Sequence, residues 1–532
     1  MNTNLRTLPA LVWLLFFPLL ASAQFMAPEK QPRRCTLKGT VVNTVTGEGV
    51  NRALVNINGQ GNISDAVLTD SEGHFSFDVP DGQLWAFTEK PGFQQSMNER
   101  SRRPISSACG SEGLTLRLEP FGVIKGKVTL EDGEPLEHAI VTASRNRIES
   151  GRRVFRQMGS AQTNEDGDFR LRDLAPGAYY ISAGPMPLRE LGSDKMAIPK
   201  TYFPGVTDRN AVGTVALAAG QQAEIKMSLK QVQAYNVSGR IVSNAPFAMA
   251  SIDLLDSSGN EVGIPIRRRD REQFDIQGVP AGVYELRTAV YDQNSLAFGV
   301  VQISISHDIS GLQLPIKPPT PIPVEFHANL SQKDPSRCCL ITHQGDHVPG
   351  ATVQLNSLKG LGQAFAVREG TPDKPSWVVK NAMPGKYNVQ VLPNGLAYAE
   401  SVRCGSTNLL AEPLTVGSGG TSDPIEISLR DDGATLAGNI TGTAENPQVL
   451  AVADDRLVPF IAGVLRNGKD ALRYSIEQLP PGDYTVYAFD SLENLEYMDP
   501  KVLEKYSSKA AHATLSANQK SELQLVLIEV EK

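Results

Sequence analysis

The sequence is poor in the residues from which most catalytic and metal sites are built. Its 532 residues include seven histidines, five cysteines and three tryptophans, and aromatic residues make up only 6% of the chain. No histidine has Glu three residues later, as a zinc carboxypeptidase requires, and neither a C-x-x-C pair nor a G-x-S-x-G elbow occurs. The sequence therefore predicts no catalytic residue, no metal ligand and no cofactor, and we expect a protein that is not an enzyme.

Strong charge of one sign is also missing. The formal net charge is −7 and charged residues make up 20% of the chain, so nothing favours nucleic acid as a partner. Two arginine-rich runs, 145–156 and 267–271, precede the same strand of neighbouring repeats. We expect solvated strand faces balanced by nearby Glu and Asp, with a stripe for an acidic polymer as the alternative.

Long apolar runs are absent after the first residues. Arg6, the run LPALVWLLFFPLL and the sequence ASA before Gln24 have the pattern of a secretory signal peptide over 1–23, followed by a linker over 24–34. No later stretch has the ~20 apolar residues of a membrane-spanning helix. We therefore expect no transmembrane segment after signal cleavage and an extracytoplasmic chain, whether secreted, periplasmic or surface-associated.

The few cysteines suit an oxidising compartment. Cys35 and Cys109 bracket the first candidate domain, and we predict a disulfide between them. A second disulfide could join Cys404 to one of the adjacent Cys338 and Cys339, for which Cys339–Cys404 is a possible pairing, and the other neighbour is left as a free thiol.

One motif recurs along the chain. FRLRDLAPGAY (169–179) places alternating apolar residues before a Pro-Gly turn and Tyr two residues after the Gly, and FDIQGVPAGVY, WVVKNAMPGKY and YSIEQLPPGDY repeat this design. A weaker copy, FSFDVPDGQLW, has Leu84 in place of the tyrosine. The copies lie 95 to 105 residues apart, as measured between their turn glycines. The turn residues of the four stronger copies are Pro176, Gly177, Tyr179, Gly282, Tyr284, Pro384, Gly385, Tyr387, Pro481, Gly482 and Tyr484.

The motif has a structural explanation. Period-two alternation is typical of a strand with one buried face. The Pro-Gly pair favours a type II turn in which the glycine takes a positive φ, and the tyrosine ring can pack inward while its hydroxyl reaches the backbone. The segments DSEGHF and NEDGDF have the residues of tight hairpin turns, although they also contain fragments of a calcium loop.

Short strands at regular spacing predict an all-β fold, a tandem array of about five antiparallel β-sandwich modules with very little helix. The best helix is DPKVLEKY, with Asp499 as N-cap and Pro500 at its first position. We call the sandwiches modules one to five. Their expected ranges are 35–120, 121–231 with an insertion, 232–314, 324–431 after a Pro-rich linker over 315–323, and 432–532 with an insertion.

Module two carries a family resemblance. GKVTLEDGEPLEHAIVTA followed by TNEDGDFRLRDLAPGAYYISA resembles a carboxypeptidase regulatory-like domain, which has a transthyretin-like sandwich. The whole arrangement is similar to secreted multi-module proteins of bacteria. The resemblance implies a seven-stranded sandwich of the carbohydrate-binding-like fold, and it implies no reaction.

These observations favour a non-catalytic binding or scaffold protein whose partner is a polysaccharide or another envelope or extracellular protein. A cell-surface structural or adhesive protein that binds other proteins is the alternative, and a metal-dependent peptidase is the third. Sugar binding usually needs exposed aromatic faces, yet Trp85 and Trp377 fall at positions expected to be core. Tyr202, Phe203 and Tyr497 lie in the insertions and are the exposed candidates.

Overall fold

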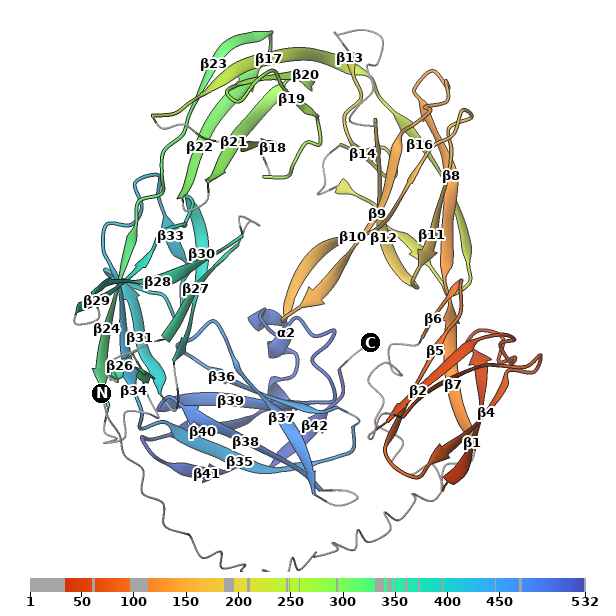
Figure 1. Ribbon diagram of the computed structural model, residues 1–532, viewed down its shortest axis with the longest axis vertical. Helices are drawn as coiled ribbons and strands as arrows, with labels where there is room; N and C mark the ends of the chain where they lie inside the picture. Colours follow the sequence, from red (N-terminus) through yellow and green to blue (C-terminus); the bar gives the residue numbers. More distant parts are fainter. Residues whose placement is uncertain are drawn as a thin grey trace, which may run out of the picture. The chain divides into compact units, whose positions relative to one another are not determined.

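In the computed structural model β-strands dominate the described part of the chain (Figure 1). It divides into two compact units, one of residues 34–43, 47–90 and 113–118 and one holding the remaining described residues, and each unit is described by itself. The structure describes residues 34–530 except 60–62, 96–112, 186–195, 208–210, 245–246, 248, 258, 293–294, 331–338, 342–346, 350, 359–361, 372–373, 394, 396, 445 and 468–470.

The strands fall into five successive groups. Module one contains β1 (Arg34–Asn43), β2 (Leu54–Gly59), β3 (Ile63–Leu68), β4 (His74–Pro80), β5 (Leu84–Glu89), β6 (Phe93–Gln95) and β7 (Leu114–Pro120). Module two contains β8 (Gly122–Leu130), β9 (Ile140–Glu149), β10 (Arg152–Gln162), β11 (Asp168–Leu174), β12 (Gly177–Gly184), β13 (Met196–Ala197), β14 (Thr201–Tyr202), β15 (Val215–Leu217) and β16 (Gln222–Leu229). Module three contains β17 (Val232–Val242), β18 (Ala250–Asp256), β19 (Ile266–Arg268), β20 (Gln273–Pro280), β21 (Gly282–Asp292), β22 (Ser295–Ile305) and β23 (Ile309–Pro315).

Modules four and five continue the series. Module four contains β24 (Ile322–Asn329), β25 (Cys339–Ile341), β26 (His347–Pro349), β27 (Ala351–Ser357), β28 (Gln363–Thr371), β29 (Lys374–Val379), β30 (Gly385–Pro393), β31 (Tyr398–Cys404), β32 (Thr407–Asn408), β33 (Leu414–Val416) and β34 (Ile425–Arg430). Module five contains β35 (Ala434–Thr441), β36 (Gln448–Ala453), β37 (Phe460–Asn467), β38 (Ala471–Leu479), β39 (Gly482–Phe489), α2 (Pro500–Glu504), the 3₁₀ turn η4 (Ser507–Lys509), β40 (Ala511–Leu515), β41 (Lys520–Glu522) and β42 (Leu525–Ile528). Strand dominates and helix is scarce, as predicted.

The same strand pairing recurs in every group. The first strand lies between the strand of the repeat motif, which is antiparallel to it, and the last strand, which is parallel to it: β8 between β11 and β16 is one instance. The other instances are β1 with β4 and β7, β17 with β20 and β23, β24 with β29 and β34, and β35 with β38 and the last two strands, β41 and β42. Opposite this sheet, β2, β9, β18, β27 and β36 pair with β5, β12, β21, β30 and β39. The all-β sandwich fold is thus confirmed, with parallel pairs among mostly antiparallel ones.

Each group encloses its own core. The buried apolar residues of modules two to five form separate clusters that lie within residues 124–229, 237–316, 322–429 and 434–525. Module one buries Leu37, Val55, Ile57, Leu84 and Leu116, each at most 1% exposed. The strands have one buried face because their apolar residues alternate with polar ones. The division into five domains stays a prediction, since the chain as a whole clusters into two units.

The repeated tyrosine makes the predicted contact in every copy that has it. The Tyr179 hydroxyl donates to the carbonyl of Ala175 at 2.6 Å. The equivalent bonds run from Tyr284 to Pro280 at 3.0 Å, from Tyr387 to Met383 at 2.8 Å and from Tyr484 to Pro480 at 2.6 Å. Burial raises the pKa of each of these phenols above its usual range. The motif therefore closes the corner where the chain passes from one sheet to the other.

The turn before the tyrosine differs from the prediction. Gly177 has a φ of 148°, and the left-handed residue of this corner is Asp173, with a φ of 58°. The β8–β11 register shifts between Leu171 and Leu174, so Asp173 belongs to a β-bulge. Gly278 and Gln478, with φ of 73° and 59°, occupy the equivalent bulges of two other modules. The predicted positive φ of the turn glycine is present at Gly177 and Gly482, at 148° and 153°, but a type II turn has about 80° at this position, so the predicted turn type is wrong for these two copies.

The acidic turns also differ in one respect. Asn164 Oδ1 accepts from the N–H groups of Asp166 and Asp168 at 3.1 and 2.7 Å, which is ordinary turn chemistry. This turn joins β10 to β11, and those two strands belong to different sheets. The equivalent turn around Asp70 joins β3 to β4, again across the sandwich. Neither segment is the tight hairpin that the sequence predicts, because each links the two layers.

In modules one, two, three and five the first strand carries a glycine that is crowded by its neighbours. A Cβ on Gly126 would lie 2.0 Å from the carbonyl oxygen of Ile225 and 3.0 Å from the ring of Phe169. Gly39, Gly239 and Gly438 are crowded in the same way by the last strand and by the aromatic ring of the motif strand. This position therefore requires glycine by close approach of backbone and ring.

Candidate functional site

The segments that resemble metal or phosphate motifs do not form such sites in the described part of the chain. No group of three or more His, Cys, Asp or Glu side chains is placed to hold a metal among the residues that the structure describes. The sequence HQGDH (343–347) has a metal-like cluster of His343, Asp346 and His347, of which His343 and Asp346 lie outside the described residues. The segment around Gly463 that formally fits a phosphate loop belongs to a hairpin, since β37 and β38 pair from Val464 with Tyr474 to Asn467 with Ala471.

The cysteine predictions have different outcomes. Cys35 lies on β1, whereas Cys109 falls outside the described residues, so their disulfide stays a prediction. Cys404 is a free thiol at the end of β31, and its Sγ donates to the carbonyl of Asp423 at 3.3 Å. Burial raises the pKa of the Cys404 thiol. The predicted Cys339–Cys404 bridge is therefore wrong: the Cys404 sulfur remains a thiol and bonds to the backbone.

Several arginines of the two runs pair with acidic side chains, among them Arg153 with Glu496. Arg156 pairs with Glu149 across the β9–β10 hairpin, and Arg269 pairs with Asp275. The Arg156 guanidinium lowers the pKa of the Glu149 carboxyl. These pairs match the expected solvated strand faces and do not favour a stripe for an acidic polymer.

A charge network lies at the end of β34. The Tyr398 hydroxyl donates to Asp432 Oδ1 at 2.8 Å, and Arg430 Nε donates to the same oxygen at 3.0 Å. Arg430 Nη1 also donates to Glu400 at 3.0 Å. The Arg430 guanidinium lowers the pKa of the Asp432 carboxyl, and burial raises the pKa of Tyr398. Every charge here has a partner within the network, so its role is structural.

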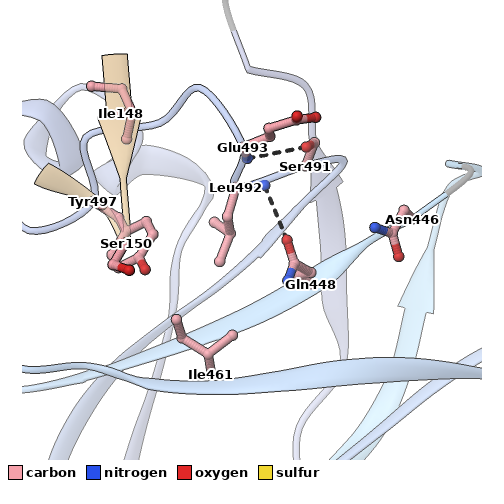
Figure 2. A pocket seen from close by; sticks show the side chains of 10 residues that line it. Ile148, Ser150, Asn446, Gln448, Ile461, Ser491, Leu492, Glu493 and Tyr497 are labelled. Atoms are coloured by element: carbon pink, nitrogen blue, oxygen red, sulfur yellow. Dashed lines mark hydrogen bonds between the residues drawn. The ribbon is translucent and has the colours of Figure 1, made fainter. Parts of the chain in front are cut away.

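A hollow of about 400 Å³ lies within the second unit (Figure 2). It is lined by Ile148, Ser150, Gly151, Asn446, Gln448, Ile461, Ser491, Leu492, Glu493 and Tyr497. Figure 2 shows that the Gln448 carboxamide accepts from the Leu492 N–H, at 3.2 Å. The Tyr497 ring lies against Gly151, where a Cβ would come within 2.4 Å of it, and the Met498 N–H donates to the Gly151 carbonyl at 3.0 Å.

The residues that line this hollow include few groups that could catalyse a reaction. Its polar groups are amides, hydroxyls and one carboxylate, that of Glu493, without a paired base or acid in the lining. Tyr497, which the sequence suggests as an exposed aromatic, packs against a second small core of module five. Phe203, a second such candidate, packs against the core of module two. The third, Tyr202, is half-buried and has the Lys200 ammonium group over its ring, 5.7 Å from the centroid. None of the three rings is an open stacking face.

A second hollow, of about 590 Å³, lies on the outward face of the β3-β2-β5 sheet in module one. The register places Asn56 opposite Phe87 and Asn58 opposite Trp85, so these four side chains share that face. Their neighbours in sequence, such as Ile57 at 0% and Thr88 at 2% exposure, point into the sandwich. We call this surface the Phe87 face; it comprises Asn56, Asn58, Ser64, Trp85, Phe87 and Glu89.

The Phe87 face was missed at the sequence level. Phe87 is 40% exposed and Trp85 is only half-buried, whereas the repeat motif predicts a core position for Trp85. The prediction fails because Leu84 takes the buried place that the other modules give to tyrosine, and the residue after it must then point outward. Trp377, the other tryptophan, does pack against the core of module four.

Residues 123–188 match the family model of the carboxypeptidase regulatory-like domain. The match covers β8 to the end of β12, which includes the motif strand and the corner tyrosine of module two. The chain therefore contains such a domain, and the resemblance expected from the sequence is confirmed. Module two exceeds the seven strands that the resemblance implies, because its insertion adds the short strands β13 and β14.

Solved structures with similar folds include bacterial pilus proteins. The shaft pilin SpaA of Lactobacillus rhamnosus GG is 8% identical, with 38% of this chain and 98% of that chain covered and a TM-score of 0.22. A streptococcal ancillary pilin is 12% identical, with 54% and 99% covered and a TM-score of 0.20. A search of curated proteins finds no significant match. At these TM-scores the function has to be argued from the chain itself.

Proposed function

We propose that this chain is a non-catalytic binding and scaffold protein of the extracytoplasmic space, with a polysaccharide or another envelope protein as its partner. One observation carries the proposal: the same two-sheet frame recurs along the chain, while the outward faces of its modules differ. A repeated frame with variable faces is how modular binding proteins present distinct surfaces on a rigid support. The matched domain is regulatory-like by description, which agrees with this role.

The proposed location rests on the N-terminal sequence. Residues 1–23 have the pattern of a signal peptide, although they lie outside the described residues. Within the described part of the chain, no helix combines the length and the apolar character needed to cross a bilayer. We propose that the mature chain is secreted, periplasmic or surface-associated.

The alternative, a structural or adhesive protein that binds other proteins, is favoured by a different surface. Phe365 and Val367 lie two residues apart on β28 and are 46% and 42% exposed, so they form an apolar stripe on one face of the strand. Exposed apolar side chains that adjoin one another are typical of protein interfaces.

The test uses the full-length mature chain in two parallel assays. Pull-down on insoluble polysaccharides tests the glycan partner, and copurification from envelope extracts tests the protein partner. Specific retention in either assay supports the proposed role. Metal-dependent release of C-terminal amino acids from peptides by the purified chain would overturn it in favour of a peptidase.

A further inference from the structure

The Phe87 face combines an exposed aromatic ring with free hydrogen-bonding groups. Phe87 and Trp85 lie two residues apart on β5, which separates them by about 6.6 Å along the strand. Phe87 is 40% exposed, so part of its ring faces solvent and can stack on the flat, weakly apolar surface of a ligand. An exposed ring of this kind is an anchor for a planar ligand rather than part of the core.

The amides beside the ring have no partner in the part of the chain that the structure describes. Within the described residues, the side chains of Asn56, Asn58, Ser64 and Glu89 make neither a hydrogen bond nor an ion pair. Each asparagine offers two donors and an acceptor, while the serine hydroxyl both donates and accepts. The centre of the face therefore presents unused donors and acceptors directly beside an aromatic ring.

The corresponding face of module two shows the opposite arrangement. There the Phe155 ring packs on the Tyr180 ring with their centroids 5.5 Å apart, and the Asn146 amide donates to the Tyr180 hydroxyl at 3.4 Å. These residues lie on β9, β10 and β12, the counterparts of β2, β3 and β5. Module two thus satisfies its aromatic and amide groups internally, whereas module one leaves them open.

The charges of the residues that border the Phe87 face indicate which class of ligand it can bind. The hollow on the Phe87 face is bordered by two carboxylates, Asp65 and Glu89. The nearest lysine in sequence, Lys90, turns its ammonium group to the carbonyls of Asn51 and Arg52 at 2.7 and 3.3 Å. An acidic face without a basic side chain in its lining repels polyanions, while its carboxylates can accept hydrogen bonds from hydroxyl groups.

We propose that the Phe87 face binds a neutral, hydroxyl-rich polysaccharide. The Phe87 ring stacks on the C–H face of one sugar, and the amides of Asn56 and Asn58 exchange hydrogen bonds with hydroxyl groups of the same or the next residue. This inference rests on the proposed binding role and deepens it, since it names the site and the ligand class.

The test is isothermal titration calorimetry. The full mature chain is titrated with the neutral probes cellohexaose, maltohexaose, xylohexaose and chitohexaose. At least one probe should bind, and the Phe87→Ala variant should lower its affinity about tenfold or more. Asn56→Ala and Asn58→Ala should each lower it several-fold. Phe87→Leu keeps an apolar side chain without the ring, so it should bind as weakly as the alanine variant.

Two matched controls accompany these variants. Leu465→Ala removes an apolar side chain that is 75% exposed on β37, and Asn51→Ala removes an exposed amide at a turn of module one. Neither change should alter affinity. Unchanged melting temperatures show that all variants are folded.

The outcomes distinguish a failure of the Phe87 face as the binding site from a failure of the proposed binding role. Failure of every neutral probe to bind overturns the inference, as does binding of polygalacturonate or heparin in their place. Undiminished binding by Phe87→Ala overturns this site but leaves the proposed binding role intact. Retention of an envelope protein without any glycan binding keeps the scaffold role and rejects the ligand class.

Discussion

The hydroxyl of Tyr179 donates to the carbonyl of Ala175, four residues earlier, at 2.6 Å. The ring is fully buried, so this bond satisfies two polar groups at the corner between the sheets of module two. Three further modules repeat the bond, and module one replaces the tyrosine by Leu84, which is also fully buried. The corner therefore needs a large buried side chain in all five copies and the hydroxyl in four of them.

The first prediction concerns this hydroxyl. Tyr179→Phe should lower the free energy of unfolding by about 1–2 kcal/mol, because it leaves the Ala175 carbonyl without its partner while keeping the ring. Scanning calorimetry of the full chain measures the effect as a lower midpoint for one transition. Tyr180→Phe, which removes a less buried hydroxyl on the outward face, is the matched control and should shift the midpoint less. An unchanged midpoint for Tyr179→Phe would show that the bond contributes nothing.

The raised pKa of Tyr179 predicts that its contribution to stability depends on pH in the alkaline range. Burial raises the pKa of Tyr179 above its ordinary value of 10.0. A group with a raised pKa in the folded state contributes stability below the unfolded value, and this contribution is lost as the pH rises through the folded value. The difference in stability between the wild type and Tyr179→Phe should therefore shrink above pH 10. A difference that stays constant up to pH 12 would contradict the burial of the phenol.

The second prediction concerns the crowded glycine of the first strand. Gly126→Ala should destabilise module two by about 3 kcal/mol, because the new methyl group would overlap the Ile225 carbonyl. Gly463→Ala is the control: no atom lies within 4 Å of its Cβ position, so we expect equal or slightly greater stability. Denaturant titration of both variants measures the contrast, and equal stability of the two would refute the close-packing argument.

The third prediction concerns acid stability. Arg430 and the Tyr398 hydroxyl both bond to the Asp432 carboxylate, and the pKa of that carboxyl is lowered below 3.8, chiefly by Arg430. A lowered pKa contributes stability above the unfolded value, and this contribution is lost as the pH falls through the folded value. At pH 7, Asp432→Asn should therefore be about 1.5 kcal/mol less stable than the wild type.

Thermal melts between pH 7 and pH 2 check this effect. The difference between the wild type and Asp432→Asn should begin to narrow below about pH 4, where this carboxyl group becomes protonated in the unfolded chain, and should be lost as the pH falls through the lower pKa of the folded state. Asp499→Asn, which keeps a capping side chain at the start of α2, is the control and should change little. If the difference in melting temperature between the wild type and Asp432→Asn stays constant at all pH values, the ion pair between Arg430 and Asp432 is not the source of this difference in stability.

The fold follows from local patterns that the sequence displays openly. Alternation in Phe169 and Leu171 marks the motif strand, and the repeated tyrosine marks the corner, because both effects depend on neighbours in sequence. The helix cap at Asp499 is predicted for the same reason, and its carboxylate accepts from the Lys501 N–H at 3.0 Å. Local chemistry was sufficient for these elements.

Other features depend on residues distant in sequence. The bulge at Asp173 arises from the pairing of β11 with β8, and the need for Gly126 arises from the approach of β16. The outward direction of Phe87 follows only once its register with Asn56 is known. Sequence patterns that act through neighbours cannot supply such register, and the candidate binding face was missed for this reason.

The last prediction concerns the cysteines of the mature chain. We expect a disulfide between Cys35 and Cys109, since both flank module one and a loop of this length would gain about 4 kcal/mol from the cross-link. Cys404 should instead be alkylated by iodoacetamide without prior reduction, and slowly, because burial raises the pKa of its thiol. Peptide mapping of the alkylated, non-reduced protein should recover a linked Cys35–Cys109 pair and a modified Cys404. Recovery of an unlinked Cys35 peptide with an alkylated thiol would contradict the disulfide. A Cys404 peptide linked to Cys339 would contradict the free thiol.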